Sequence, residues 1–175
     1  MTKLRELFRW VFNPPTAGPK ATLLIRLMTG SVFLWEGILK FVFPSLGVVR
    51  FTKLGMPWPE LTATFVGCLE IIGGASLILG LATRFFAIAF IIEMIVAILS
   101  TKIPIYQNTN PLPAAPAPPT HGLAAALHDG RTDLAQLLTS IFLLIVGPGP
   151  WSVDALIKKH RHHAEPALDT AHPVA

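Results

Sequence analysis

The chain has 175 residues, of which 52% are hydrophobic and only 14% are charged. Soluble domains carry about 25% charged residues, so this composition excludes an ordinary soluble domain and predicts one integral membrane domain. The formal net charge of +4 is compatible with nucleic-acid binding. However, the basic residues stand at the ends of apolar segments and form no single stripe, so we expect the lipid bilayer as partner and no nucleic acid.

The N-terminal segment, residues 1–20, predicts a short amphipathic helix followed by a hinge. Within residues 2–12 the apolar side chains share one helical face: Leu4, Leu7, Phe8 and Val11. A helix with this pattern lies at the membrane surface. Pro14 ends it, because proline lacks a backbone donor and restricts the residue before it.

Four apolar segments predict an all-α fold, a four-helix transmembrane bundle that occupies residues 21–157. The expected spans are residues 22–43, 61–81, 85–101 and 133–147. The turn between the second and third spans is so short that these two helices must be antiparallel neighbours. The fourth segment is shorter than the roughly 20 residues that a crossing needs. It therefore either starts earlier, near Leu123, or rests against the bundle without crossing fully.

Two segments outside the spans have a biased composition. Residues 102–120 are rich in proline and predict an extended outer loop. Residues 158–175 form a basic tail that we expect to be disordered, with its histidines solvated. Cys68 is the only cysteine, which excludes an intrachain disulfide and a thiolate zinc site. We therefore expect no metal site and no intrinsic cofactor.

The lysines and arginines predict the orientation of the spans. Of the 14, 12 lie outside the spans, and four crossings place eight of these on the side of the termini and four on the other side. Cytoplasmic loops carry the excess of positive charge. The distribution predicts a multi-pass protein with both termini in the cytoplasm.

Three of the apolar segments carry a carboxylate near their middle: Glu36, Glu70 and Glu93. A charged side chain at this depth costs about 2.5–3.5 kcal/mol on insertion scales, so these groups should face the interior of the bundle. Small residues flank two of them on the same helical stripe, Gly67 and Gly74 beside Glu70, and Ala89 and Ala97 beside Glu93. Small residues let helices approach closely, which supports an interior position.

Further polar residues point to the same interior. Arg26, Glu36 and Lys40 fall on one side of the first helix, and the i,i+4 spacing of Glu36 and Lys40 allows an ion pair. Asp133 and Gln136 lie on the polar face of the fourth helix. Because two cations cannot neutralise four carboxylates, we expect at least one glutamate to be neutral and able to carry a proton.

Two interpretations of these polar residues remain open. They either form interhelical ion pairs and hydrogen bonds that set the packing, or they bind a small polar or redox ligand. No span contains a histidine, which excludes a bis-histidine haem. The chain also lacks a phosphate-binding glycine loop and a nucleophile elbow.

The order and spacing of these residues resemble those of the DoxX family of small four-helix membrane proteins, over about residues 22–157. The matching positions are Arg26, Gly30, Gly37, Lys40, Gly55-Met56-Pro57, Gly67, Glu70, Gly73-Gly74, Gly80, Thr83, Arg84, Asp133-Leu134, Gly147-Pro148-Gly149 and Ser152-Val153-Asp154. The family often has a longer acidic residue at the position of Asp133. The proline-rich loop is a departure of this chain.

The resemblance implies a protein of the bacterial inner membrane. Some relatives are quinol-linked subunits in thiosulfate oxidation, and others belong to membrane oxidoreductase complexes. It therefore favours a subunit that binds a quinone inside the bundle, with Glu70 and Glu93 transferring protons and Arg26 or Lys40 polarising a carbonyl oxygen. Redox proteins and further copies of the chain are the candidate partners.

Residue roles follow from this interpretation. The expected ligand-binding residues are Arg26, Glu36, Lys40, Asp133 and Gln136, and the expected structural residues are Gly67, Gly74 and Arg84. Two alternatives use the same chain differently: a small proton-coupled carrier, and a membrane scaffold with no catalytic activity.

Overall fold

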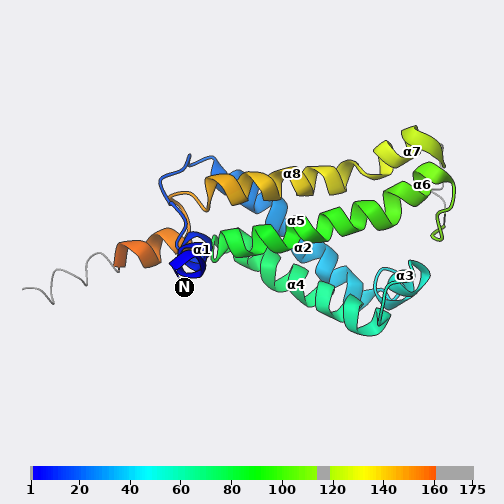
Figure 1. Cartoon of the computed structure of the whole chain (residues 1–175), viewed down its shortest axis with the longest axis horizontal. Helices are drawn as coiled ribbons and strands as arrows, with labels where there is room; N and C mark the ends of the chain where they lie inside the picture. Colours follow the sequence, from blue (N-terminus) through cyan, green and yellow to red (C-terminus); the bar gives the residue numbers. More distant parts are fainter. Residues whose placement is uncertain (1, 114–118, 161–175) are drawn as a thin grey trace, which may run out of the picture.

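The chain folds into two pairs of helices, as a computed structural model of residues 2–113 and 119–160 shows. In one pair α2 (Thr22–Val42) packs along α4 (Pro59–Leu79), and in the other α5 (Thr83–Ala97) packs along α8 (Arg131–Val146). The pairs cross near α1 (Thr2–Phe12) and diverge toward the opposite end (Figure 1). We call the end with α1 the terminal end. The end with α3 (Val48–Lys53), α6 (Ile103–Gln107) and α7 (Gly122–Asp129) is the loop end.

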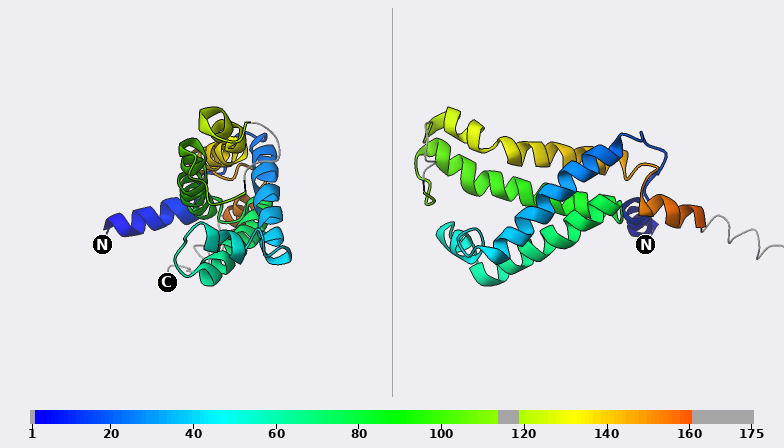
Figure 2. Two further views of the ribbon diagram at one scale, coloured as in Figure 1. Left: turned by 90° about the vertical axis from the view of Figure 1, so that its right-hand side faces the viewer. Right: turned by 180° about the vertical axis from the view of Figure 1, so that it is seen from behind.

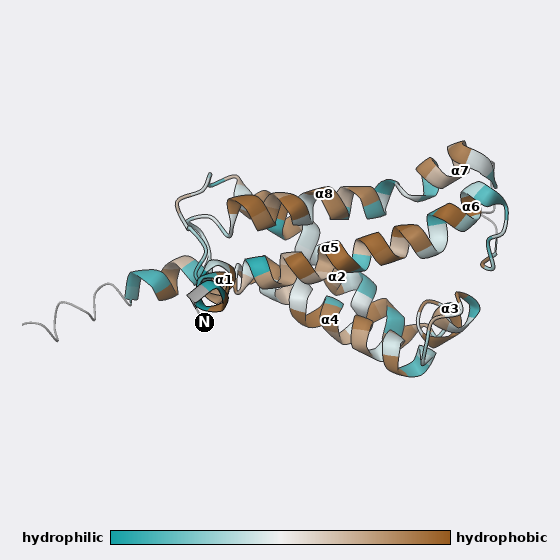
Figure 3. Ribbon diagram, in the orientation of Figure 1, coloured by the Kyte–Doolittle hydropathy of each residue, from teal (hydrophilic) through white to brown (hydrophobic). Residues whose placement is uncertain are grey.

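Three helices are long and apolar enough to cross a membrane: Thr22–Val42, Pro59–Leu79 and the continuous run Thr83–Gln107. Most of their residues are apolar (Figure 3), and large apolar side chains such as Leu24, Phe65 and Ile92 are exposed, as lipid contact requires. The expected all-α fold with a short N-terminal helix is therefore confirmed for three spans. α8 has only 16 residues and follows α7 after a single residue, Gly130. α8 alone is therefore too short to show a fourth span.

The third span does not end near residue 101 as expected. It continues as a π-helical segment, η1 (Ile98–Lys102), and then as α6. In the π-helical register the Ile103 N–H donates to Ile98 O, five residues back. Pro104 follows at the start of α6, where a missing backbone donor costs little. The expected outer loop therefore starts at Asn108, and its residues 114–118 lie outside the described residues.

Glycines set the close approach of α2 and α4. A Cβ atom on Gly74 would lie 2.5 Å from the Leu34 backbone nitrogen and 2.7 Å from Gly30 O. A Cβ atom on Gly67 would lie 2.7 Å from the Phe41 ring. Because the obstacles at Gly74 are backbone atoms, no side chain can move aside to accept a methyl group there. This placement is what a structural role for Gly67 and Gly74 requires.

Arg26 holds the terminal end together from inside the protein. Its guanidinium group donates four hydrogen bonds to main-chain carbonyls, to Leu77 O (3.0 Å), Ile78 O (2.9 Å), Pro148 O (2.8 Å) and Trp151 O (2.7 Å). Two of these carbonyls belong to the last turn of α4, where helices leave acceptors unsatisfied. Arg26 thereby joins α2 to α4 and to the segment after α8.

Arg84 ties α1 and α8 to the start of α5. It donates to Leu144 O (2.9 Å) and Ile145 O (3.1 Å) in α8 and to Trp10 O (3.1 Å) in α1. Its guanidinium carbon also lies 4.3 Å from the centroid of the Trp10 ring, a cation–π distance. From this anchor α1 projects sideways from the bundle (Figure 2).

A further helix, residues 153–160, follows α8. The Asp154 carboxylate accepts hydrogen bonds from the backbone N–H groups of Ala82 (3.0 Å) and Thr83 (3.3 Å), and so caps the start of α5. The expected disordered tail is thus helical in its first three residues, 158–160. Its remainder lies outside the described residues.

The four bonds of Arg26 predict a large loss of stability on Arg26→Lys. A lysine ammonium cannot reach four divergent carbonyls, and each buried acceptor left unsatisfied costs about 1–3 kcal/mol. We expect the free energy of unfolding in detergent micelles to fall by at least about 2 kcal/mol. The matched change Arg5→Lys, on the exposed surface of α1, should have little effect. Equal stability of the two variants would show that the bonds of Arg26 are dispensable.

Candidate functional site

A cavity of about 690 Å³ lies where the two helix pairs diverge, and we call it the membrane cavity. Six polar residues that the sequence selected line it together: Glu36, Lys40, Glu70, Glu93, Asp133 and Gln136. Most other lining side chains are apolar and come from α2, α3, α4 and α5. A cavity with a few convergent polar groups in an apolar wall is typical of a ligand site.

Lys40 and Glu70 form the centre of the polar group. Lys40 Nζ donates a hydrogen bond to Glu70 Oε1 at 2.7 Å and lies 2.6 Å from Glu70 Oε2. Both side chains are largely buried, with 14% and 3% of their surface exposed. The pair joins α2 to α4, and its charges are shielded from water.

The expected pair of Glu36 with Lys40 does not form, because Lys40 turns to Glu70 instead. The reason is the close packing at Gly37, where a Cβ atom would lie 2.8 Å from Glu70 Cβ. This packing brings a fully buried carboxylate within reach of Lys40. Glu36 remains exposed at the cavity wall. An exposed carboxylate loses less hydration than a buried one, so it depends less on a neighbouring cation.

Glu93 and Gln136 complete the polar group from the other helix pair. The Glu93 side chain, on α5, lines the membrane cavity together with Glu70 on α4. The cavity wall therefore presents two carboxyl groups, one from each helix pair, beside the single Lys40 ammonium. Glu93 Oε2 and Gln136 Oε1 are buried without a hydrogen-bond partner among the described residues. Buried polar atoms are normally paired, so these two favour water or a ligand in the cavity.

Asp133 belongs to the rim of the membrane cavity at the loop end. Lys102 Nζ lies 2.9 Å from Asp133 Oδ2 and 2.5 Å from Asp129 Oδ2, which joins the third helix to α7 and α8. The sequence interpretation missed Lys102, because it placed this residue in the loop. A helix continued through Pro104 would have put Lys102 on a face with the other polar residues.

Arg26 does not reach the membrane cavity. The structure places it at the terminal end, where every one of its hydrogen bonds goes to the main chain. Arg84 also lies at that end and binds main-chain carbonyls. The geometry therefore assigns Arg26 the same kind of contact as Arg84, and leaves Lys40 as the cation beside the carboxyl groups.

The membrane cavity also opens sideways. α4 and α5 meet at the tight turn near Gly80 and separate toward the loop end (Figure 1). Phe65 on α4 and Ile92 on α5 both line the cavity and are 64% and 58% exposed. Because these side chains face the surroundings of the span as well as the cavity, an apolar molecule can enter between α4 and α5.

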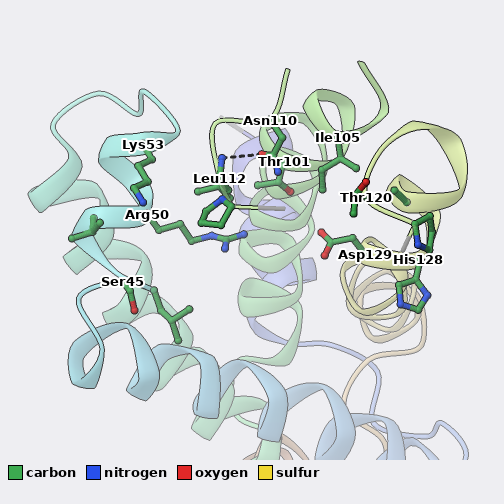
Figure 4. Close-up of a pocket in the computed structure, with 15 residues that line it drawn as sticks. Ser45, Arg50, Lys53, Thr101, Ile105, Asn110, Leu112, Thr120, His128 and Asp129 are labelled. Carbon is green, nitrogen blue, oxygen red and sulfur yellow. Dashed lines mark hydrogen bonds between the residues drawn. The ribbon is translucent and has the colours of Figure 1, made fainter. Parts of the chain in front are cut away.

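A smaller cavity of about 360 Å³ lies at the loop end (Figure 4). Arg50 extends from α3 into this loop-end cavity, and its guanidinium group has no hydrogen bond or ion pair with the described residues. Leu46, Arg50 and Thr101 line both cavities. The two cavities are therefore adjacent, with an unpaired cation between them that the sequence interpretation did not select.

The Lys40–Glu70 pair predicts non-additive effects on stability. Lys40→Met leaves a carboxylate buried without its cation and should lower the free energy of unfolding by about 3 kcal/mol. Adding Glu70→Leu removes the stranded group, so the double variant should be more stable than Lys40→Met alone. Denaturant titration in micelles measures both, with the exposed Lys53→Met as control. Additive losses in the double variant would contradict a buried ion pair.

Comparison with known proteins shows the family of the chain. The family model for DoxX matches residues 21–103. An uncharacterized membrane protein of Mycobacterium tuberculosis is 41% identical over 143 residues, which are 81% of this chain and 84% of that protein. A Bacillus subtilis protein named "Putative oxidoreductase CatD" is 28% identical over 138 residues, 79% of this chain and 87% of that protein. No solved structure matches the chain. The match to the mycobacterial protein and the family model show that this multi-pass membrane protein belongs to the DoxX family.

Proposed function

We propose that the membrane cavity binds a quinone-like molecule and exchanges protons with its ring oxygens, within a membrane redox system. The observation that carries the proposal is the group of Lys40, Glu70, Glu93 and Gln136, buried at the inner part of a cavity that is open to lipid. The name of the Bacillus subtilis relative is that of an oxidoreductase, which supports a redox role.

The residues of the cavity fit the chemistry of a quinone. Its ring oxygens need hydrogen-bond donors, which the Lys40 ammonium and the Gln136 amide supply. Its apolar tail needs a path to lipid, which the opening between Phe65 and Ile92 provides. Two carboxyl groups in one cavity can accept a proton from the ligand and return it, as general acid–base chemistry requires.

The proposed reaction needs a partner protein, because a quinone exchanges electrons as well as protons. A bound quinone takes up two electrons and two protons to become the quinol, and the reverse reaction releases them. In our proposal Glu70 and Glu93 carry the protons, and a partner redox protein supplies or removes the electrons. This chain is then the ligand-binding subunit of the system and does not act alone.

We further propose that α7 and α8 together make the fourth crossing. α8 packs along α5 and α7 packs along α6, and α5 and α6 belong to the same continuous run, Thr83–Gln107. α7 and α8 therefore extend in the same general direction, with a short irregular connection between them (Figure 2). Four crossings put both ends of the chain on one side. The excess of positive charge on that side supports our proposal that the termini lie in the cytoplasm of a bacterium. α1 then lies at the inner surface, with Leu4 and Phe8 exposed to lipid.

Gln136→Leu tests the ligand site with little risk to the fold. The change removes a buried amide whose Oε1 has no partner, so the free protein should be as stable as wild type or more stable. Binding of a short-chain quinone, followed by titration in micelles, should weaken about 10- to 100-fold, because one buried donor is lost.

The control for this titration is Gln107→Leu, which changes the only other glutamine of the described residues, on an exposed site outside both cavities. Its quinone affinity should match that of wild type. Unchanged affinity in Gln136→Leu, or absence of quinone binding to wild type, would refute the proposal.

A further inference from the structure

We infer that the carboxyl pair in the membrane cavity exchanges protons with water at the loop end only, and that the terminal end is closed. The inference deepens the proposed function, since it gives the proton transfer of Glu70 and Glu93 a direction across the membrane. The evidence is the packing of side chains between the carboxyl pair and each end of the bundle.

Two stacked phenylalanines form what we call the floor of the membrane cavity between the helix pairs. Outside this floor the cavity wall continues along α5 only to the apolar, half-exposed Phe85. Phe33 on α2 and Phe90 on α5 lie with ring centroids 3.7 Å apart and an interplanar angle of 4°. Their side chains are 2% and 0% exposed, and Phe33 also lines the cavity. Phe90 precedes Glu93 by three residues, so it lies about one helical turn nearer the terminal end. The floor therefore sits directly below the carboxyl group.

The protein below this floor is closed by apolar packing and by saturated arginines. Leu77, Ala87 and Leu143 join Phe33 and Phe90 in one buried cluster and are themselves 0% exposed. Further toward the terminal end, Arg26 and Arg84 direct their guanidinium groups into main-chain carbonyls. An arginine held by several carbonyls cannot swing aside to admit water without breaking all of these bonds.

Three buried hydroxyl groups on the terminal side of the floor, on Thr22, Thr29 and Ser140, have no partner among the described residues. Thr29 and Ser140 are 0% exposed and stand one helical turn beyond Phe33 and Gln136 toward the terminal end, and Thr22 is 1% exposed at the first residue of α2. They would form part of a path to the terminal end only if water filled the space around them. A cysteine at position Ser140 therefore reports directly whether water reaches the protein below the floor.

The loop end of the membrane cavity is polar and open by contrast. Ser100, Thr101, Thr132 and Asp133 line the cavity on that side. Arg50, which is unpaired within the described structure, lines both this cavity and the loop-end cavity. Water that enters beside Arg50 meets polar side chains on its way to Glu93. With the termini in the cytoplasm, oxidation of a bound quinol would release its protons on the outer side.

Cysteine accessibility in sealed proteoliposomes tests this inference. Cys68 is replaced by alanine in the full chain, and single cysteines are introduced as Ala97→Cys in the cavity wall and Ser140→Cys below the floor. Asn13→Cys and Thr52→Cys, both exposed, mark the terminal and loop ends. A permanently charged methanethiosulfonate reagent is added to one side, and intact mass reports modification. It reacts only with hydrated thiols and does not cross lipid.

The expected result is that Ala97→Cys is modified from the side that modifies Thr52→Cys and not from the side that modifies Asn13→Cys. Ser140→Cys should stay unmodified from both sides. Modification of Ala97→Cys or Ser140→Cys from the terminal side would overturn the inference. Thr132→Cys replaces Ala97→Cys if the latter does not fold. Because no quinone is present, the outcome is independent of the titration of Gln136→Leu, and the two proposals can fail separately.

Discussion

The ion pair of Lys40 and Glu70 is the interaction on which the rest of the structure depends. It forms where α2 and α4 approach so closely that a methyl group on Gly37 would collide with Glu70. A buried ion pair gains little over apolar packing, but removal of one partner leaves an uncompensated charge. The pair therefore fixes the polar group inside the bundle at the point where the helix pairs separate, and so defines the inner part of the membrane cavity.

Much of this arrangement follows from the sequence. The free-energy cost of a carboxylate in an apolar helix, together with its small neighbours, is enough to predict that Glu70 and Glu93 face the interior of the bundle. The partner of Lys40 was not predictable, because spacing along one helix favours Glu36 and only the contact of α2 with α4 brings Glu70 nearer. The end of the third helix was also missed, since a π-helical turn before Pro104 has no clear sequence signal.

Arg26 shows why chemical type alone does not assign a role. An arginine inside an apolar helix suggests an anion or a carbonyl of a ligand, and here it binds carbonyls of the main chain. Its acceptors lie between 51 and 125 residues away along the chain, so no local pattern reveals them. Arg50 shows the opposite error. The sequence suggests an ordinary charged residue of a loop, and the structure places it between two cavities. A closed terminal end and an open loop end follow from these two placements.

Photoaffinity labelling with a quinone that carries a photoreactive group on its tail tests the central claim most directly. If the ring lies beside Lys40 and Gln136 and the tail leaves between α4 and α5, mass spectrometry should find the label on Phe65 or Ile92, and an excess of unmodified quinone should suppress it. Label confined to exposed apolar residues that do not line the cavity, such as Ile145 near the terminal end of α8, and insensitive to competitor, would contradict a quinone site in the membrane cavity.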